Sequence, residues 1–139
     1  MNNNFERIFA DHIIIENVNS SRATVTEAKE FKELLDEDIL LNENDIIVDL
    51  TNCQQIDSTF LGVLVMAMKK LKLKNRKLIL VDPKDENCRN ALSMMGTYLS
   101  FEVQGSRENA LNFIARKKQI KHYPIEYKTK KKKVLSFAL

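Results

Sequence analysis

Hydrophobic and polar positions follow two alternating periods along the chain, which predicts strands and helices in turn. Short apolar runs rich in β-branched and aromatic residues predict strands at residues 5–9, 12–18, 46–50, 78–81 and 101–104. Apolar residues at helical spacing predict helices that begin at Thr24, run over about 58–71 and 86–95, and begin again at Ser106. Strands joined by helices are parallel, whereas the first two strands follow one another directly. We therefore expect an α/β fold, a mixed sheet of four to five strands with about four helices packed on it.

Several local signals support the boundaries of these elements. Thr24-Val25-Thr26-Glu27 fits a capping box at the start of the first helix. Ala10-Asp11 suits a tight connection between the first two strands, and Gly96 is a suitable cap for the end of the third helix. Ile46-Ile47-Val48 is apolar at three successive positions, which predicts a strand covered on both faces.

Charge divides the chain into two parts. Residues 1–115 hold 13 Lys and Arg against 18 Asp and Glu, a net charge of −5. Residues 116–139 hold 9 Lys and Arg against Glu126 alone, a net charge of +8. We expect one folded domain over residues 1–115, followed by a basic tail that extends the last helix and then becomes flexible.

Several classes of protein are disfavoured by what the sequence contains. The longest apolar run, Phe60–Met68, is too short to span a bilayer, and no secretory signal is visible. Cys53 and Cys88 stand far apart without zinc-type spacing. His12 and His122 are isolated, and no motif pairs a nucleophile with a base. We predict a cytoplasmic protein that is not an enzyme and binds no cofactor, metal or nucleic acid directly.

The segment Asp57-Ser58-Thr59 carries the most information about function. It follows the best strand and opens a helix, so Asp57 is a natural N-cap and Ser58 a polar residue of the first turn. The same position would present a hydroxyl at a helix N-terminus, where a phosphate is electrostatically favoured and would meet the Asp57 carboxylate. A response-regulator receiver, with Asp49 at the strand end, is a third reading, but the second acid and the lysine of such a site are missing.

Residues around this segment resemble the STAS family, and within it the anti-sigma-factor antagonists. The matching stretches are Ile46-Ile47-Val48-Asp49-Leu50-Thr51-Asn52 and Ile56-Asp57-Ser58-Thr59-Phe60-Leu61-Gly62-Val63-Leu64. Leu78–Val81, Ala91–Gly96 and the strand at Phe101 also fit, so the resemblance covers roughly residues 5–115.

The resemblance implies a bacterial switch that regulates transcription by binding a partner. Ser58 would be the phosphoacceptor, with Thr59 a less favoured one, and residues 57–62 would bind the partner: Asp57, Ser58, Thr59, Phe60, Leu61 and Gly62. The implied partners are an anti-sigma factor that is a serine kinase of the GHKL type and a phosphatase. ATP and Mg²⁺ would belong to the kinase.

Two features leave an alternative function open. Phe60 stands where the family usually has Gly, and its ring either limits the approach of a kinase to Ser58 or contacts a different partner. The tail, with Lys130–Lys133 followed by apolar residues, fits a solvated arm, a segment that binds acidic lipid or nucleic acid, or a helix that docks on a partner or another subunit. The alternative is a STAS subunit of a membrane-associated or transport complex that is never phosphorylated. The sequence leaves the oligomeric state open.

Overall fold

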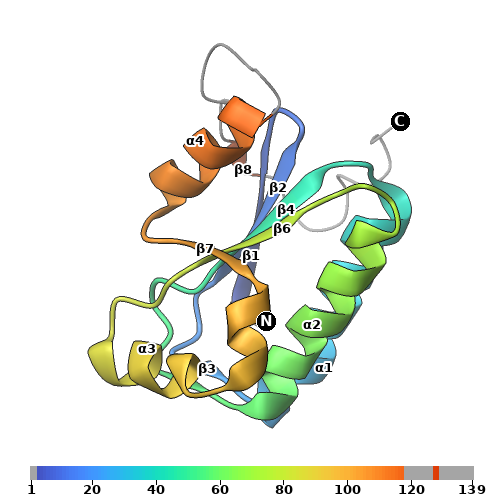
Figure 1. The fold of residues 1–139 in the computed structure, drawn as a ribbon. Helices are drawn as coiled ribbons and strands as arrows, with labels where there is room; N and C mark the ends of the chain where they lie inside the picture. The colour runs from blue at the N-terminus through green and yellow to red at the C-terminus, as the bar shows by residue number, and fades with distance from the viewer. Residues whose placement is uncertain (1–2, 118–126, 129–139) are drawn as a thin grey trace.

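A mixed sheet forms the centre of the molecule in the computed structural model, which describes residues 3–117 and 127–128 (Figure 1). Its strands lie in the order β7-β6-β4-β2-β1-β8. Among the described residues, the pairs β1–β2 and β1–β8 are antiparallel and the other pairs of this sheet are parallel. The strands are β1 Phe5–Ala10, β2 Ile13–Val18, β4 Asp45–Asp49, β6 Leu78–Val81, β7 Glu102–Gln104 and β8 Tyr127–Lys128.

Helices cover both faces of this sheet. They are α1 Val25–Leu41, α2 Ser58–Lys72, α3 Glu86–Ser93 and α4 Arg107–Lys117, with a 3-10 helix, η1, at Gly96–Ser100. Figure 1 shows α1 and α2 side by side, with α4 across the sheet from them. Along β4, Ile46 and Val48 pack toward α1 and α2, whereas Ile47 packs toward α4. The prediction of a strand buried on both faces is confirmed, as is the α/β architecture.

The structure differs from the predicted boundaries at a few points. The first hairpin turns at Asp11 and His12, with His12 at φ 61°, because Ala10 is still paired in β1. Gly96 does not cap α3; that helix ends at Ser93 with Met94 as its cap, and Gly96 begins η1.

Three two-residue strands have no counterpart in the sequence prediction. β3 (Arg22–Ala23) and β5 (Gln55–Ile56) pair with each other in a small parallel sheet, and β8 adds to the edge of β1. The predicted basic tail, residues 116–139, falls outside the described residues after Lys117, except for β8.

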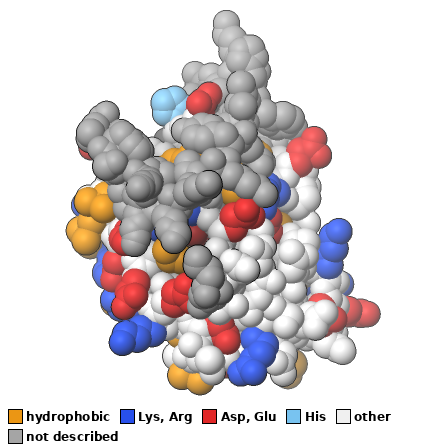
Figure 2. All heavy atoms as spheres, turned by 180° about the vertical axis from the view of Figure 1, so that it is seen from behind, with side chains coloured by type: hydrophobic (Ala, Val, Ile, Leu, Met, Phe, Trp, Pro, Cys, Tyr) orange, Lys and Arg blue, Asp and Glu red, His pale blue; other side chains and the backbone are white. Residues whose placement is uncertain are grey.

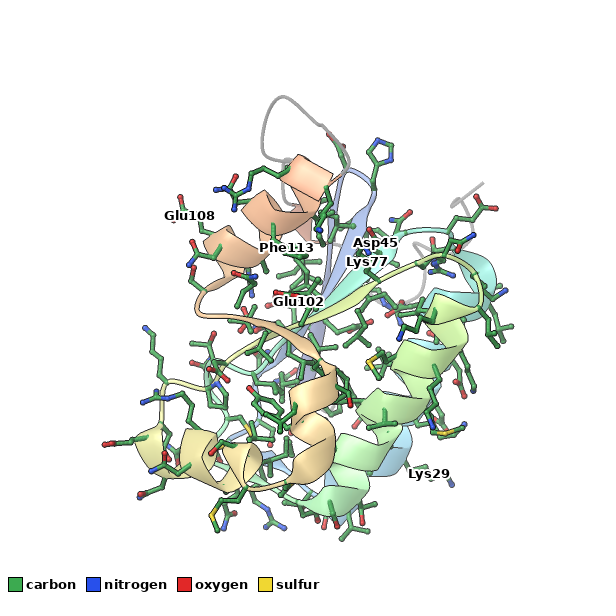
Figure 3. All side chains as sticks on the ribbon, viewed as in Figure 1. Lys29, Asp45, Lys77, Glu102, Glu108 and Phe113 are labelled. Atoms are coloured by element: carbon green, nitrogen blue, oxygen red, sulfur yellow. The ribbon has the colours of Figure 1, made fainter. Side chains whose placement is uncertain are left out.

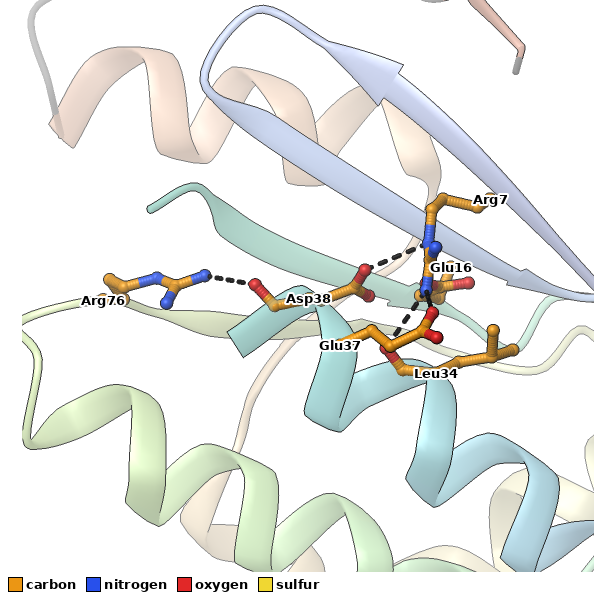
Figure 4. A network of polar contacts seen from close by, with 6 residues as sticks. All are labelled: Arg7, Glu16, Leu34, Glu37, Asp38 and Arg76. Carbon is orange, nitrogen blue, oxygen red and sulfur yellow. Dashed lines mark hydrogen bonds and ion pairs between the residues drawn. The ribbon is translucent and has the colours of Figure 1, made fainter. Parts of the chain in front are cut away.

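A buried group of charges joins α1 to the first hairpin (Figure 4). Arg7 and Glu16 face each other across β1 and β2, and the Arg7 Nε lies 2.8 Å from the Glu16 carboxylate. The same nitrogen lies 3.0 Å from Asp38 of α1, and Arg7 Nη2 donates to the Leu34 carbonyl. Two buried carboxylates therefore share one guanidinium, which fastens the helix to the sheet.

The ionisation of this group is shifted by its surroundings. Burial raises the pKa of Asp38 well above its ordinary value, and the nearby charge of Glu16 and a hydrogen bond to it act in the same direction. Burial opposes the charge on Arg7, but the carboxylates of Glu16 and Asp38 outweigh it and raise the pKa of the guanidinium. These surroundings therefore disfavour ionisation of Asp38 relative to an exposed carboxyl group.

Candidate functional site

The small β3–β5 sheet positions the segment that begins with Asp57. Gln54 and Gln55 both donate their backbone N–H groups to the Ser21 carbonyl, and Asp57 donates its own to Ala23. The residue before α1 and the residue before α2 are thereby held close together, although they are far apart in the sequence. Both helices begin at this corner of the molecule, where Figure 1 shows their lower ends.

One carboxylate caps both helices. Asp57 Oδ1 accepts the N–H of Phe60 in the first turn of α2 at 2.9 Å. Its other oxygen, Oδ2, accepts the N–H of Val25, the first residue of α1, at 2.8 Å. Asp57 thus satisfies donors that each helix would otherwise leave unpaired, and its negative charge lies at the positive ends of two helix dipoles.

The capping box predicted for α1 is present beside this contact. Glu27 accepts hydrogen bonds from both the backbone N–H of Thr24, at 2.9 Å, and the Thr24 hydroxyl, at 2.8 Å. Two carboxylates, Asp57 and Glu27, therefore occupy the N-terminal end of α1. An additional anion at this corner would meet both of them.

Ser58 and Thr59 occupy the first two positions of α2, and both side chains are exposed. The hydroxyl of Ser58 lies on the surface of the helix N-terminus, directly after the capping carboxylate. The cap predicted from the sequence is therefore Asp57, which leaves Ser58 available for contact or modification.

Phe60 and Leu61 lie inside the protein and not on its surface. The Phe60 ring is fully buried and stacks on Phe31 of α1, with the ring centroids 4.9 Å apart. The buried ring therefore adds nothing to the surface around Ser58 in this structure. Its role is to pack α2 against α1, and the accessible part of the predicted segment is reduced to Asp57, Ser58, Thr59 and Gly62.

A shallow groove continues from this surface between α1 and α2. It has a volume of about 220 Å³, and its walls come from Lys32, Leu35 and Asp36 of α1 and from Thr59, Gly62 and Met66 of α2, among others. Gly62 is exposed, and a Cβ at this position would meet no atom within 4 Å apart from its chain neighbours and the backbone of its own helix. The groove and Ser58 share the first turns of α2, so a partner that covers Ser58 can reach the groove as well.

The remaining candidate residues have structural partners. Asp49 is buried, accepts from the Thr51 N–H and lies 3.0 Å from Arg107 Nε, so it ties β4 to α4. Cys53 and Cys88 are buried, and a hydrogen bond between the two thiols, together with burial, raises the pKa of Cys53. Neither arrangement presents a reactive group to solvent.

The described part of the chain has neither a metal-type cluster nor a helix of membrane-spanning character. Residues 3–117 and 127–128 hold no cluster of three or more His, Cys, Asp or Glu with the geometry of a metal site. No helix within these residues has the length and apolar character needed to cross a bilayer. On the face shown in Figure 2, acidic and basic side chains are intermingled over the described surface.

The bond between Asp57 and the start of α1 could not be read from the sequence. It joins residues 32 positions apart, and no local pattern connects them. The buried Asp38 left a weak signal, because it follows Leu35 and precedes Ile39 on the apolar side of α1. An acid at such a position requires a buried partner, but the pattern does not say which one.

Comparison with known proteins agrees with this geometry. A family model described as the STAS domain matches residues 11–110. A candidate anti-sigma factor antagonist from Thermotoga maritima superimposes with a TM-score of 0.70 and 24% identity, over 81% of this chain and 95% of that one. The comparison with curated proteins gave no match.

Two further proteins share the fold at lower identity. The Bacillus anti-sigma factor antagonist SpoIIAA, in its unphosphorylated form, has a TM-score of 0.63 and 12% identity over 81% of this chain and 97% of that one. The same protein is also known in its phosphorylated form. The murine anion transporter Slc26a9 has a TM-score of 0.64 and 15% identity over 78% of this chain, but the match spans only 18% of the transporter.

Proposed function

Since the chain belongs to the STAS domain family, we propose that it is an anti-sigma-factor antagonist whose binding is controlled at Ser58. In its unphosphorylated form it binds an anti-sigma factor that is also a serine kinase, of the GHKL type, and so releases the sigma factor. The kinase transfers the γ-phosphoryl group of ATP to the Ser58 oxygen, with loss of the hydroxyl proton and release of ADP. A phosphatase restores the hydroxyl.

The observation that carries this proposal is the exposed Ser58 hydroxyl beside the doubly bonded Asp57 carboxylate. A kinase needs a reachable hydroxyl on a rigid surface. Because Asp57 fixes the first turn of α2 to α1, Ser58 stands on such a surface and not on a loose loop. The existence of SpoIIAA in phosphorylated and unphosphorylated forms supports a switch of this type in the same fold.

A phosphate on Ser58 would affect mainly the protein surface around this residue, and not the core. It adds a charge of about −1.5 to −2 at neutral pH next to Asp57. Both Asp57 oxygens already accept backbone N–H groups, so the two helices have fewer donors left for the new anion. The phosphate is therefore held outward, where it repels an acidic surface and blocks close packing on α2.

The first test is phosphosite mapping of the protein purified from its host, combined with identification of co-purifying proteins. We expect a phosphate on Ser58 and a bound kinase in the unphosphorylated fraction. Binding to that kinase should be retained by Ser58→Ala and reduced by Ser58→Asp about tenfold or more, which is the effect of a misplaced charge in a packed interface.

Ser93→Asp is the matched control, because Ser93 is also an exposed serine on a helix but lies at the end of α3. It should leave kinase binding unchanged. Thr59→Ala separates the two candidate acceptors and should leave phosphorylation intact. Equal kinase binding by Ser58→Ala and Ser58→Asp would rule out the switch.

The alternative is a STAS subunit of a membrane-associated complex that is never phosphorylated. The observation that favours it is the fold match to a small part of the transporter Slc26a9. Under this alternative, Ser58 stays unmodified in all growth conditions and a membrane protein co-purifies with both Ser58 variants. The same purification therefore distinguishes the two functions.

A further inference from the structure

The end of the molecule opposite Ser58 is formed by the C-terminal ends of α1 and α2. The two helices run parallel, since both begin at Asp57 and the Lys70 ammonium lies 3.2 Å from Asp36 further along. Arg76, just after α2, donates to the carbonyl oxygens of Ile39 and Asp38 at the end of α1 and of Asn44 beyond it. The turn after α2 is thereby fixed against the end of α1.

Three leucines project from this end into solvent. Leu40 and Leu41 in the last turn of α1 are 75% and 51% exposed, and Leu73, the residue that caps α2, is 88% exposed. An isolated exposed leucine is ordinary, but three on two adjoining segments form an apolar tip that the fold leaves uncovered.

Basic residues surround this apolar tip. Residues 69–77 contain six Lys and Arg and no acid. Lys72, Lys74 and Lys77 are exposed on either side of Leu73. Lys72 and Lys77 also line a groove of about 250 Å³ together with Lys117, the last residue of α4. The α4 terminus, after which the +8 segment continues, therefore belongs to the same basic end.

The residues labelled in Figure 3 mark the two ends of the sheet. Lys77 and Phe113 are seen toward one end of the sheet, and Lys29, near the start of α1, lies toward the other. A contact at the Leu73 end would leave the Asp57 corner facing away from it.

We propose that this end, defined by Leu40, Leu41, Leu73, Lys72, Lys74 and Lys77, docks the protein on an anionic lipid surface. The leucines enter the boundary between headgroups and acyl chains, and the lysines contact the negative headgroups. The protein then rests on the membrane with Ser58 directed toward the aqueous phase, where a partner can still reach it.

The exposed leucines favour a lipid surface over a nucleic acid as the binding partner of this end. Lysines alone would suit phosphates of either kind, but a nucleic-acid backbone offers nothing apolar to a leucine that is 88% exposed. Asp11, Glu37, Glu43 and Glu102 are acids toward this end, but none of them lies in the segment around Leu73. Residues 69–77 hold no acid, so the positive charge is concentrated beside that leucine.

The test is co-sedimentation of the full chain with vesicles of phosphatidylcholine alone or mixed with phosphatidylglycerol. We expect binding only to the mixed vesicles, with loss of binding as NaCl is raised. Lys72→Glu combined with Lys74→Glu should weaken partitioning about tenfold or more. Leu40→Ser combined with Leu73→Ser should weaken it about fivefold, because these side chains insert into the bilayer boundary.

Lys29→Glu combined with Lys84→Glu is the matched control, since both lysines are exposed but lie elsewhere. It carries the same change of net charge and should bind as the unaltered protein does. Equal weakening by this control would show a response to net charge alone and would overturn the proposal. So would equal binding to neutral and mixed vesicles, or no binding to either.

A fourth variant separates the folded end from the tail. Replacement of Lys130–Lys133 by Ser should leave the effects of Leu73→Ser and Lys74→Glu in place. If the tail variant abolishes binding while the variants of the folded end have no effect, the proposal is wrong. Binding to single-stranded RNA that is insensitive to Leu40→Ser and Leu73→Ser, with no vesicle binding, would equally overturn it.

Discussion

Two groups of carboxylates hold α1 in place, and they differ in exposure. Asp57 lies half-exposed at the N-terminal ends of α1 and α2, where its oxygens accept backbone N–H groups. Asp38 and Glu16 are completely buried between α1 and the sheet, where they share the guanidinium of Arg7 (Figure 4). The same chemical group thus meets neutral dipoles at one place and a full charge at the other.

The difference shows how burial separates a group that the fold requires from one that tolerates a change of charge nearby. A buried carboxylate must have a partner, so a change in the Arg7 group is felt by the whole fold. A half-exposed carboxylate at a helix end can receive a second anion nearby, because solvent screens part of the repulsion. The Asp57 corner can therefore change charge while the protein remains folded.

Removal of the shared cation should have the largest effect. Arg7→Met leaves Glu16 and Asp38 buried without their guanidinium, and we expect a loss of about 3–5 kcal/mol in the free energy of unfolding. Urea denaturation followed by circular dichroism measures this loss. The triple variant Arg7→Met, Glu16→Leu and Asp38→Leu should recover most of it; failure of that recovery would show that packing, and not charge, makes the site essential.

Removal of the double cap should come next. Asp57→Ala deletes two hydrogen bonds to helix N-termini, and we expect a loss of about 2 kcal/mol, twice the usual value for one cap. Asp85→Ala is the control, because Asp85 caps only α3 through the N–H of Cys88. Thermal unfolding that shows equal losses for the two variants would contradict a double role for Asp57.

The pH dependence of stability tests the buried pair. Because the pKa of Asp38 is raised in the folded state, the folded protein binds more protons than the unfolded chain above the ordinary pKa of Asp. Its contribution is therefore fully present below that pKa and is lost as the pH rises toward the folded-state value, with a slope of up to about 1.4 kcal/mol per pH unit.

Asp38→Asn should abolish this slope. An amide can still donate to Glu16 but does not ionise, so the stability of the variant should fall less between acidic and neutral pH than that of the unaltered protein. Other groups face the same site, namely Arg7, Glu16 and Glu37, and they are retained in both proteins. Parallel stability curves for the two proteins would show that Asp38 is ionised in the folded state.

The smallest effect on stability is expected at Ser58. Ser58→Asp places an acid at the favourable end of a helix but beside Asp57, so we expect a change within about 0.5 kcal/mol in either direction. If Ser58→Asp also causes a large loss of partner binding, then Ser58 controls binding without supporting the fold, whereas Arg7 supports the fold. A destabilisation as large as that of Asp57→Ala would show that Ser58 supports the fold.

Much of the fold could be predicted because its elements are long enough to show a period. The strand at Ile46–Val48 shows as an unbroken apolar run, and the apolar stripe of α2 recurs at helical spacing over several turns. The cap at Asp57 follows from residue type and position. The two-residue strands β3 and β5 are too short for any period. Phe60 could not be placed either, because its partner Phe31 lies on another helix.

The candidate site could be predicted where it depends on local residue type and position, and not where it depends on contacts between distant elements. The sequence placed Asp57 at the cap and Ser58 in the first turn of α2, as the structure has them. The hydrogen bond from Val25 to Asp57 and the ion pair between Arg7 and Asp38 could not be predicted from the sequence. Those contacts depend on which elements meet in space, and the order of elements alone leaves that open.

The double cap also has a consequence for the order in which the chain assembles. A bond between residues 32 positions apart can form only after a long loop has closed, and the entropy cost of that closure precedes any gain from the bond. The capping box of α1 is local, so it can stabilise this helix before α2 forms. The start of α1 docks on α2 only when Asp57 comes close to it. Mutation of Asp57 should then mainly accelerate unfolding, with little change in the folding rate, if this corner closes after the rate-limiting step.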